Sequence, residues 1–235
     1  MKKINLINHK VFNAVTENFS VYLKKCDIVK RKKPKQTKSE IYTAMTFWYL
    51  MNIVRCIDQL YCSLDMLSNY KNKIKNQGMN RAEYIAYGIE NIYLRITSVF
   101  DRSLRLANVI FEVGLPERDC KTSTIINNEN IKSTETGKCL KMLEKSIEKF
   151  KNKRNEIAHK NSYDDEEFYE IEIFELLQNC GRLDTSQYIY GKQKMDEYVI
   201  QKKKSFMESI NSIEQIVNQL FDAISNEYQK RNVVV

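Results

Sequence analysis

Three side chains with chemical potential stand close together in one short segment: Arg154, Asn155 and His159. Arg154 continues an otherwise apolar helical stripe, and a desolvated guanidinium needs an anion as its partner. A carboxylate of the same fold, from Asp101 or Glu90, would satisfy it, and so would a phosphate of a ligand. An imidazole exchanges protons near neutral pH, so His159 is suited to general acid–base chemistry.

The spacing of the three residues limits what they can touch together. At about 100° per residue of an α-helix, Asn155 and His159 point only about 40° apart, whereas Arg154 and His159 point about 140° apart. Asn155 and His159 can therefore contact the same group. Arg154 joins them only if the helix frays or turns near His159, or if a second copy of the chain completes the site.

The elements that position this segment are expected to be helices. The 235 residues include only six Gly and two Pro, 43% of them are apolar, and no strand pattern of useful length occurs. We predict an all-α fold, an up-and-down helical bundle with long central helices and a C-terminal helix. The whole chain, residues 1–235, is expected to form a single all-helical domain.

Periodicity, capping residues and breakers predict the helix bounds. The segment that begins at Ser39 and Glu40 is apolar nearly all round, which predicts the central, most buried helix. Residues 119–137 are rich in Thr, Ser and Asn and are predicted to be the least ordered part of the middle of the chain. The basic run 30–35 and residues 181–191 are predicted loops or turns. The predicted helices are 5–29, 41–67, 80–113 (opened by a capping box of Asn80 and Glu83), one from Lys138 through the Arg154 segment, 168–180 (capped by Asp164 with Glu167) and about 194–231.

Two of these helices have patterns with further meaning. The helix 80–113 is amphipathic, and its polar face carries Arg95, Ser98, Asp101 and Arg102. The last helix carries apolar residues in a 4-3-4-3-4 spacing, an a/d seam that fits an ordinary bundle contact or a dimer-forming coiled coil. The seam residues are Phe206, Ile210, Ile213, Val217, Leu220 and Ile224.

Charge and cysteine content narrow the environment and the partners. The net charge of +8 suits a partner with phosphates, although an abundance of Lys, Asn and Ile from coding bias would also produce it. The six cysteines form no CxxC pair and only two histidines are present, so neither a metal nor another cofactor is expected. With no signal segment and no apolar run of about 18 residues, we predict a soluble cytoplasmic protein without membrane contact.

The segment Arg-Asn-x-x-Ala-His, at the exit of an amphipathic helix in a basic all-helical chain, resembles the R-x4-H motif of the HEPN superfamily. The resemblance covers residues of about 40–180. The upstream pattern Tyr93-Leu94-Arg95-x-x-Ser98-x-x-Asp101-Arg102 is similar to that of one prokaryotic HEPN branch.

The resemblance implies a metal-independent endoribonuclease in which two protomers bring their motifs together. His159 would exchange a proton with the ribose 2′-OH or the leaving 5′-oxygen, Arg154 would bind the scissile phosphate, and Asn155 would orient either group. The products would be a 2′,3′-cyclic phosphate and a 5′-hydroxyl. Asp101, Ser98, Arg95 and Arg102 are secondary candidates. Asp101 would orient His159, and Arg95 or Arg102 would hold flanking phosphates, with Ser98 beside them. Alternatively, these four residues form an ordinary solvated helix face.

Three functions remain open at this stage. The first is a homodimeric HEPN ribonuclease that acts on RNA as a toxin or anti-phage effector, with an antitoxin or other regulatory protein as partner. The second is a non-catalytic HEPN-like module that binds a nucleotide, RNA or a protein. The third is a helical adaptor that assembles through the seam of the last helix.

Overall fold

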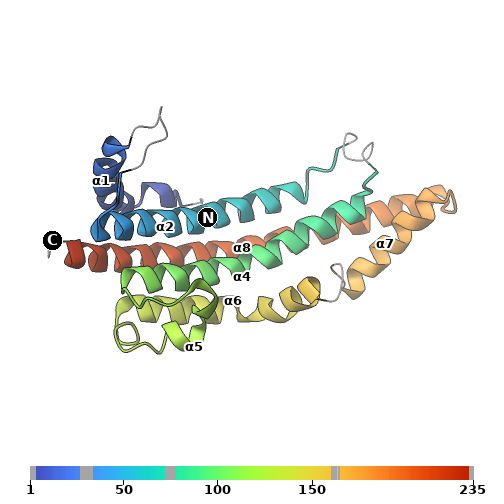
Figure 1. Cartoon of the computed structure of the whole chain (residues 1–235). Helices are drawn as coiled ribbons and strands as arrows, with labels where there is room; N and C mark the ends of the chain where they lie inside the picture. The colour runs from blue at the N-terminus through green and yellow to red at the C-terminus, as the bar shows by residue number, and fades with distance from the viewer. Residues whose placement is uncertain (1–3, 27–33, 72–77, 160–162, 164, 233–235) are drawn as a thin grey trace. The chain divides into compact units, whose positions relative to one another are not determined.

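The computed structural model describes residues 4–26, 34–71, 78–159, 163 and 165–232. These residues form helices and turns, and no strand occurs among them, which confirms the predicted all-α bundle (Figure 1). The elements are η1 Leu6–Asn8, α1 Lys10–Lys25, α2 Lys38–Met66, α4 Arg81–Ile110, η2 Glu117–Asp119, α5 Thr122–Ile125, α6 Glu135–His159, α7 Glu166–Asn179 and α8 Thr185–Asn232.

The residues group into two compact units. The first comprises Met1–Ile57, Ser98–Ile147 and Asn211–Val235, and the second comprises Asp58–Thr97 and Glu148–Ile210. The long helices α2, α4, α6 and α8 each contribute residues to both units. The second unit contains the end of α6 with its Arg-Asn-x-x-Ala-His segment, together with all of α7.

The N-terminal helix is shorter than predicted. Helix α1 begins at Lys10 rather than near residue 5 because His9 acts as its N-cap, with Nδ1 accepting a hydrogen bond from the Val11 amide at 3.1 Å. It ends at Lys25, and residues 27–29 of the predicted helix lie outside the described residues, as does 30–33 of the predicted basic loop. The described part of that loop, residues 34–35, is not helical, and neither are residues 36–37 that follow it.

Helix α2 begins at Lys38, three residues before its apolar run, and a capping box precedes it. The Thr37 hydroxyl accepts from the Glu40 amide at 3.2 Å and Glu40 accepts from the Thr37 amide at 2.8 Å, so the cap is Thr37 rather than Ser39. The prediction that this is the most buried helix is wrong for its first half. Ile41, Met45 and Trp48 are 44%, 43% and 56% exposed, because a helix that is apolar all round can bury only the side that faces its neighbours.

Helix α4 confirms the prediction made from its pattern. The Asn80 and Glu83 side chains each accept from the other residue's amide, at 2.9 and 2.8 Å, and form the predicted capping box. The predicted apolar side is buried throughout; its members are Ile85, Ile89, Ile92, Ile96, Val99, Phe100, Ser103 and Ile110. The helix ends at Ile110 rather than near 113, and Gly114 follows with a φ of 79°.

The segment 119–137 is compact, so the prediction of a poorly ordered stretch is wrong. It contains α5 and buries Ile125, Ile126 and Ile131 in the first unit. Its Thr and Asn residues serve as caps and turns: the Thr134 hydroxyl accepts from the Gly137 amide at 3.1 Å as α6 begins. Polar composition here reflects tight turns around three buried isoleucines.

The starts of the last two helices also differ from the prediction. Asp164 lies outside the described residues, and the N-cap of α7 is Asp165, which accepts from the Phe168 amide at 2.8 Å. Helix α8 begins at Thr185 rather than near 194, because Asp184 and Gln187 form a capping box with bonds of 2.8 and 3.0 Å. Only residues 181–184 of the predicted turn region are therefore non-helical.

The a/d seam of α8 is part of the protein's own core. Its six apolar residues are at most 5% exposed within one chain. The seam is thus a bundle contact, and it is not available as the surface of a coiled-coil dimer or of an adaptor. Among the described helices, none has both the length and the apolar character that crossing a membrane would require.

Gly137 provides a test of the packing at the start of α6. A Cβ at this position would lie 2.3 Å from the carbonyl oxygen of Ile131, which belongs to the backbone and cannot rotate away. We expect Gly137→Ala to lower the free energy of unfolding by about 2 to 4 kcal/mol, although Gly-to-Ala within a helix is ordinarily stabilising by up to ~1 kcal/mol. Urea denaturation would measure the change. Ser146→Ala on the same helix is the matched control, and equal stability of both variants would contradict the predicted clash.

Candidate active site

The end of α6 presents the polar side chains of the motif. The helix is unbroken through His159, its last residue. Arg154 is half-buried, whereas Asn155 and His159 are exposed. The guanidinium Nη1 of Arg154 donates to Oδ1 of Asn155 at 3.0 Å. The structure therefore brings Arg154 and Asn155 together, and Asn155 lies one helical turn before His159 on the same side of the helix.

The hydrogen bond to Asn155 changes the reach of Arg154. In an unbroken helix the Cα–Cβ directions of Arg154 and His159 differ by about 140°, but the long Arg side chain swings over Asn155 and towards the side that carries His159. The Nε of the same guanidinium is buried without a hydrogen-bond partner among the described residues. The alternative partner Glu90 accepts from the Tyr163 amide at 2.5 Å, and no ion pair joins it to Arg154 in the described part of the chain.

The secondary candidates are distributed over both units. Arg95 belongs to the second unit, where its Nη1 donates to Oε1 of Gln59. Ser98, Asp101 and Arg102 belong to the first unit, where Arg102 donates to the Asn52 carbonyl at 2.6 Å. Their predicted role beside His159 stays a prediction.

A buried polar cluster follows the motif directly. The Asp165 carboxylate accepts hydrogen bonds from the hydroxyls of Tyr163 and Tyr198, the latter at 2.9 Å, and from the Lys202 ammonium at 2.8 Å. The two hydroxyls also contact each other at 2.9 Å. Tyr163 is 2% exposed and Tyr198 is fully buried, so the cluster connects the chain after α6 to α8.

The electrostatics of the cluster favour an ionised carboxylate. Partial burial alone would raise the pKa of Asp165, but hydrogen bonds from Lys202, Tyr163, the Phe168 amide and Tyr198 outweigh it and lower the pKa to about 2. Burial, together with the neighbouring carboxylate, raises the pKa values of Tyr163 and Tyr198, so both hydroxyls remain protonated donors. The ammonium of Lys202 also lies 4.9 Å from the ring centre of Tyr198.

This cluster holds the chain where it leaves the motif. Tyr163 stands four residues after His159; its amide bonds to Glu90 of α4 and its hydroxyl to Asp165. The ammonium of Lys153, next to Arg154, lies 5.6 Å from the ring centre of Tyr163. The sequence does not reveal this cluster, because Tyr163 and Asp165 lie more than 30 residues before Tyr198 and Lys202. An Asp shortly before Phe168, which is expected as a helix cap, is the one local signal.

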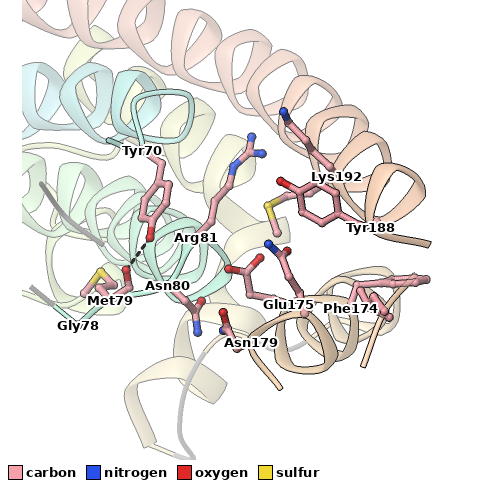
Figure 2. A pocket seen from close by; sticks show the side chains of 14 residues that line it. Tyr70, Gly78, Met79, Asn80, Arg81, Phe174, Glu175, Asn179, Tyr188 and Lys192 are labelled. Atoms are coloured by element: carbon pink, nitrogen blue, oxygen red, sulfur yellow. Dashed lines mark hydrogen bonds between the residues drawn. The ribbon is translucent and has the colours of Figure 1, made fainter. Parts of the chain in front are cut away.

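A cavity of about 500 Å³ lies in the second unit. It lies where the start of α4, the end of α7 and the start of α8 meet, and it contains none of the predicted site residues. Figure 2 shows Arg81, Glu175, Tyr188 and Lys192 around it.

A bundle of long helices with Arg and His spaced five apart at a helix end is the arrangement that the HEPN resemblance predicts. The family model described as Cthe2314-like HEPN matches residues 32–225. This match covers most of the chain, and the protein belongs to the Cthe2314-like HEPN family. No curated protein and no solved structure matched the chain significantly. Membership points to a ribonuclease-type or nucleotide-binding function.

The pH dependence of stability tests the Asp165 cluster. Because the folded pKa of about 2 lies below the ordinary value of 3.8, the stabilisation is present at neutral pH and is lost as the pH falls through 4 towards 2. The Asp165 side chain is 25% exposed, and with solvent screening we expect Asp165→Asn to cost about 1 to 2 kcal/mol at pH 7.

Urea denaturation of the wild type and Asp165→Asn at several pH values measures this effect. The difference in unfolding free energy should shrink steadily below pH 4. Asp196→Asn on α8, whose carboxylate is 49% exposed, is the control and should change stability by less than about 1 kcal/mol. If Asp165→Asn lowers the free energy of unfolding by the same amount at pH 7 and at pH 2, the role assigned to the ionised carboxylate is contradicted.

Proposed function

We propose that this protein is a metal-independent endoribonuclease that cuts RNA by attack of the ribose 2′-OH on the adjacent phosphodiester. The observation that supports the proposal is the hydrogen-bonded pair of Arg154 and Asn155 one turn before the exposed imidazole of His159. A guanidinium cation beside an imidazole that can exchange a proton fits the needs of this reaction. The net charge of +8 favours a polyanionic substrate.

Each group has a distinct task in this mechanism. The imidazole of His159 takes the proton of the 2′-OH, the 2′-oxygen forms a bond to phosphorus, and the bond from phosphorus to the 5′-oxygen breaks. The leaving 5′-oxygen takes a proton from an imidazolium or from water. Arg154 binds the non-bridging oxygens and stabilises their additional charge in the transition state, while Asn155 holds the guanidinium in place. The products are a 2′,3′-cyclic phosphate and a 5′-hydroxyl.

The proposed active form is a homodimer. His159 is exposed and is the last residue of α6, so this helix end can face the same helix end of a second copy across a two-fold axis. Two imidazoles would then be present, one to remove a proton and one to donate it. An enzyme of this kind acts in the cytoplasm as a toxin or an anti-phage effector, and an antitoxin or other regulatory protein would keep it inactive.

Cleavage of a fluorescent single-stranded RNA in the presence of EDTA tests the reaction. We expect His159→Ala and Arg154→Ala each to slow cleavage at least about 100-fold, since general acid–base catalysis and oxyanion stabilisation each contribute on that order. His9→Asn, which retains an N-cap acceptor, and Lys145→Ala, which removes an exposed charge of α6, are the controls. Single-stranded DNA of the same sequence should remain intact. Unchanged cleavage by folded His159→Ala would reject the proposed mechanism.

Mixing the two inactive variants tests whether the site is shared between protomers. If Arg154 of one protomer acts with His159 of its partner, a mixed dimer of Arg154→Ala and His159→Ala combines one Arg154 with one His159, water donates the proton to the leaving oxygen, and part of the activity returns. If each chain supplies a complete site, every chain in the mixture carries a defect and no activity returns. Cleavage rates after co-refolding of the two variants distinguish these outcomes.

A further inference from the structure

The cavity between the ends of α4, α7 and α8 is large enough for a small organic ligand. Its volume of about 500 Å³ lies within the range of about 300 to 1,000 Å³ usual for such sites. All of its lining residues belong to the second unit, and the Arg154 motif is not among them. A ligand here would therefore be separate from the scissile phosphate of the proposed reaction.

One wall of the cavity is suited to a flat ring. Tyr188 and Phe174 line the cavity (Figure 2), and so does Met195. Phe174 is held in place by an edge-to-face contact with Tyr190, with 5.6 Å between ring centres. It also packs on Gly191, where a Cβ would come within 3.0 Å of the Phe174 side chain. The fixed ring of Phe174 and the ring of Tyr188 are the kind of aromatic surface on which a nucleobase stacks.

Two cations lie beside this wall. Arg81, the first residue of α4, uses Nη2 to bind Asp196 at 2.5 Å, which orients the guanidinium and leaves its other N–H groups for a ligand. Lys192 is exposed at the cavity, and Figure 2 shows its ammonium on the same side as Arg81. A phosphate group satisfies both cations.

The remaining lining groups suit the hydrogen-bonding edge of a base. Glu175 presents a half-buried carboxylate to the cavity near Asn179 (Figure 2), and Gln178 also lines the cavity. A carboxylate accepts hydrogen bonds and donates none. It matches the adjacent N1–H and N2 amine donors of guanine, whereas uracil offers a single N–H between two carbonyl acceptors that the carboxylate repels.

We propose that this cavity binds one nucleotide unit, with guanine as the preferred base, stacked on Tyr188 and Phe174 and read by Glu175, and with its phosphate held by Arg81 and Lys192. The unit is either a free nucleotide or a guanosine within a single RNA strand, because both present the same base and phosphate. Binding in this cavity does not require cleavage by the Arg154 motif. Nucleotide binding and the proposed ribonuclease activity can therefore be tested, and rejected, independently.

Calorimetric titration of the full-length His159→Ala protein with GMP and UMP tests the pocket without RNA turnover. We expect GMP to bind at least about ten-fold more tightly than UMP, a difference of one charge-assisted hydrogen bond. Glu175→Gln should weaken GMP binding about ten-fold and narrow the difference between the two nucleotides. Lys192→Ala should weaken both by a similar factor, since it removes a phosphate contact.

Lys194→Ala is the matched control. It lies two residues further along α8, with its ammonium 5.7 Å from the ring centre of Tyr190 rather than in the cavity, and should alter GMP binding less than about two-fold. Thermal unfolding of each variant confirms that it is folded. Absence of GMP binding at millimolar concentration, or equal binding of GMP and UMP that Glu175→Gln leaves unchanged, would overturn the proposal.

A competition experiment identifies the source of the nucleotide. If the cavity takes a guanosine of RNA, GMP displaces a fluorescent guanine-containing oligoribonucleotide from the His159→Ala protein, and Lys192→Ala weakens RNA and GMP binding together. If it takes a free nucleotide, GMP binds without displacing RNA. Both results support the pocket, and RNA cleavage assays report separately on the Arg154 motif.

Discussion

The carboxylate of Asp165 is the centre on which the surroundings of the motif depend. It caps α7 by accepting a hydrogen bond from the Phe168 amide. It also accepts hydrogen bonds from the hydroxyls of Tyr163 and Tyr198 and from the ammonium of Lys202. One ionised group thus determines where α7 begins, how the chain after α6 is held and which side of α8 faces it. Its negative charge is compensated by four donors, which is the condition under which a partly buried carboxylate stabilises a fold.

Local signals predicted those elements whose residues act within a few positions of one another. The Asn80–Glu83 box and the isoleucine spacing of α4 lie within one helix, and the structure confirms both. The start of α7 was misplaced because adjacent Asp residues compete for the cap, and the tyrosines that favour Asp165 come from elsewhere in the chain. Gly191 suggested a turn, yet it lies within α8, and its lack of a side chain makes room for Phe174.

The Arg154 motif and the cavity of the second unit differ in how far the sequence alone could reveal them. Arg154, Asn155 and His159 stand in one short segment, so their types and spacing were sufficient to select them. The cavity is assembled from the ends of three helices, and Arg81, Glu175 and Lys192 have no recognisable spacing. Both features nevertheless combine a cation with a hydrogen-bonding group, which is the combination that the two proposed ligand sites require.

The scarcity of histidine gives the protein a native spectroscopic reporter. His9, whose side chain is 8% exposed, is fixed as the cap of α1 and lies 3.4 Å from Asp222, and burial lowers its pKa. His159 is exposed at the end of α6. An NMR spectrum of labelled imidazoles would therefore contain one resonance from a mostly buried ring and one from an exposed ring, so the proposed binding of RNA at the motif can be tested without attaching a probe or altering a residue.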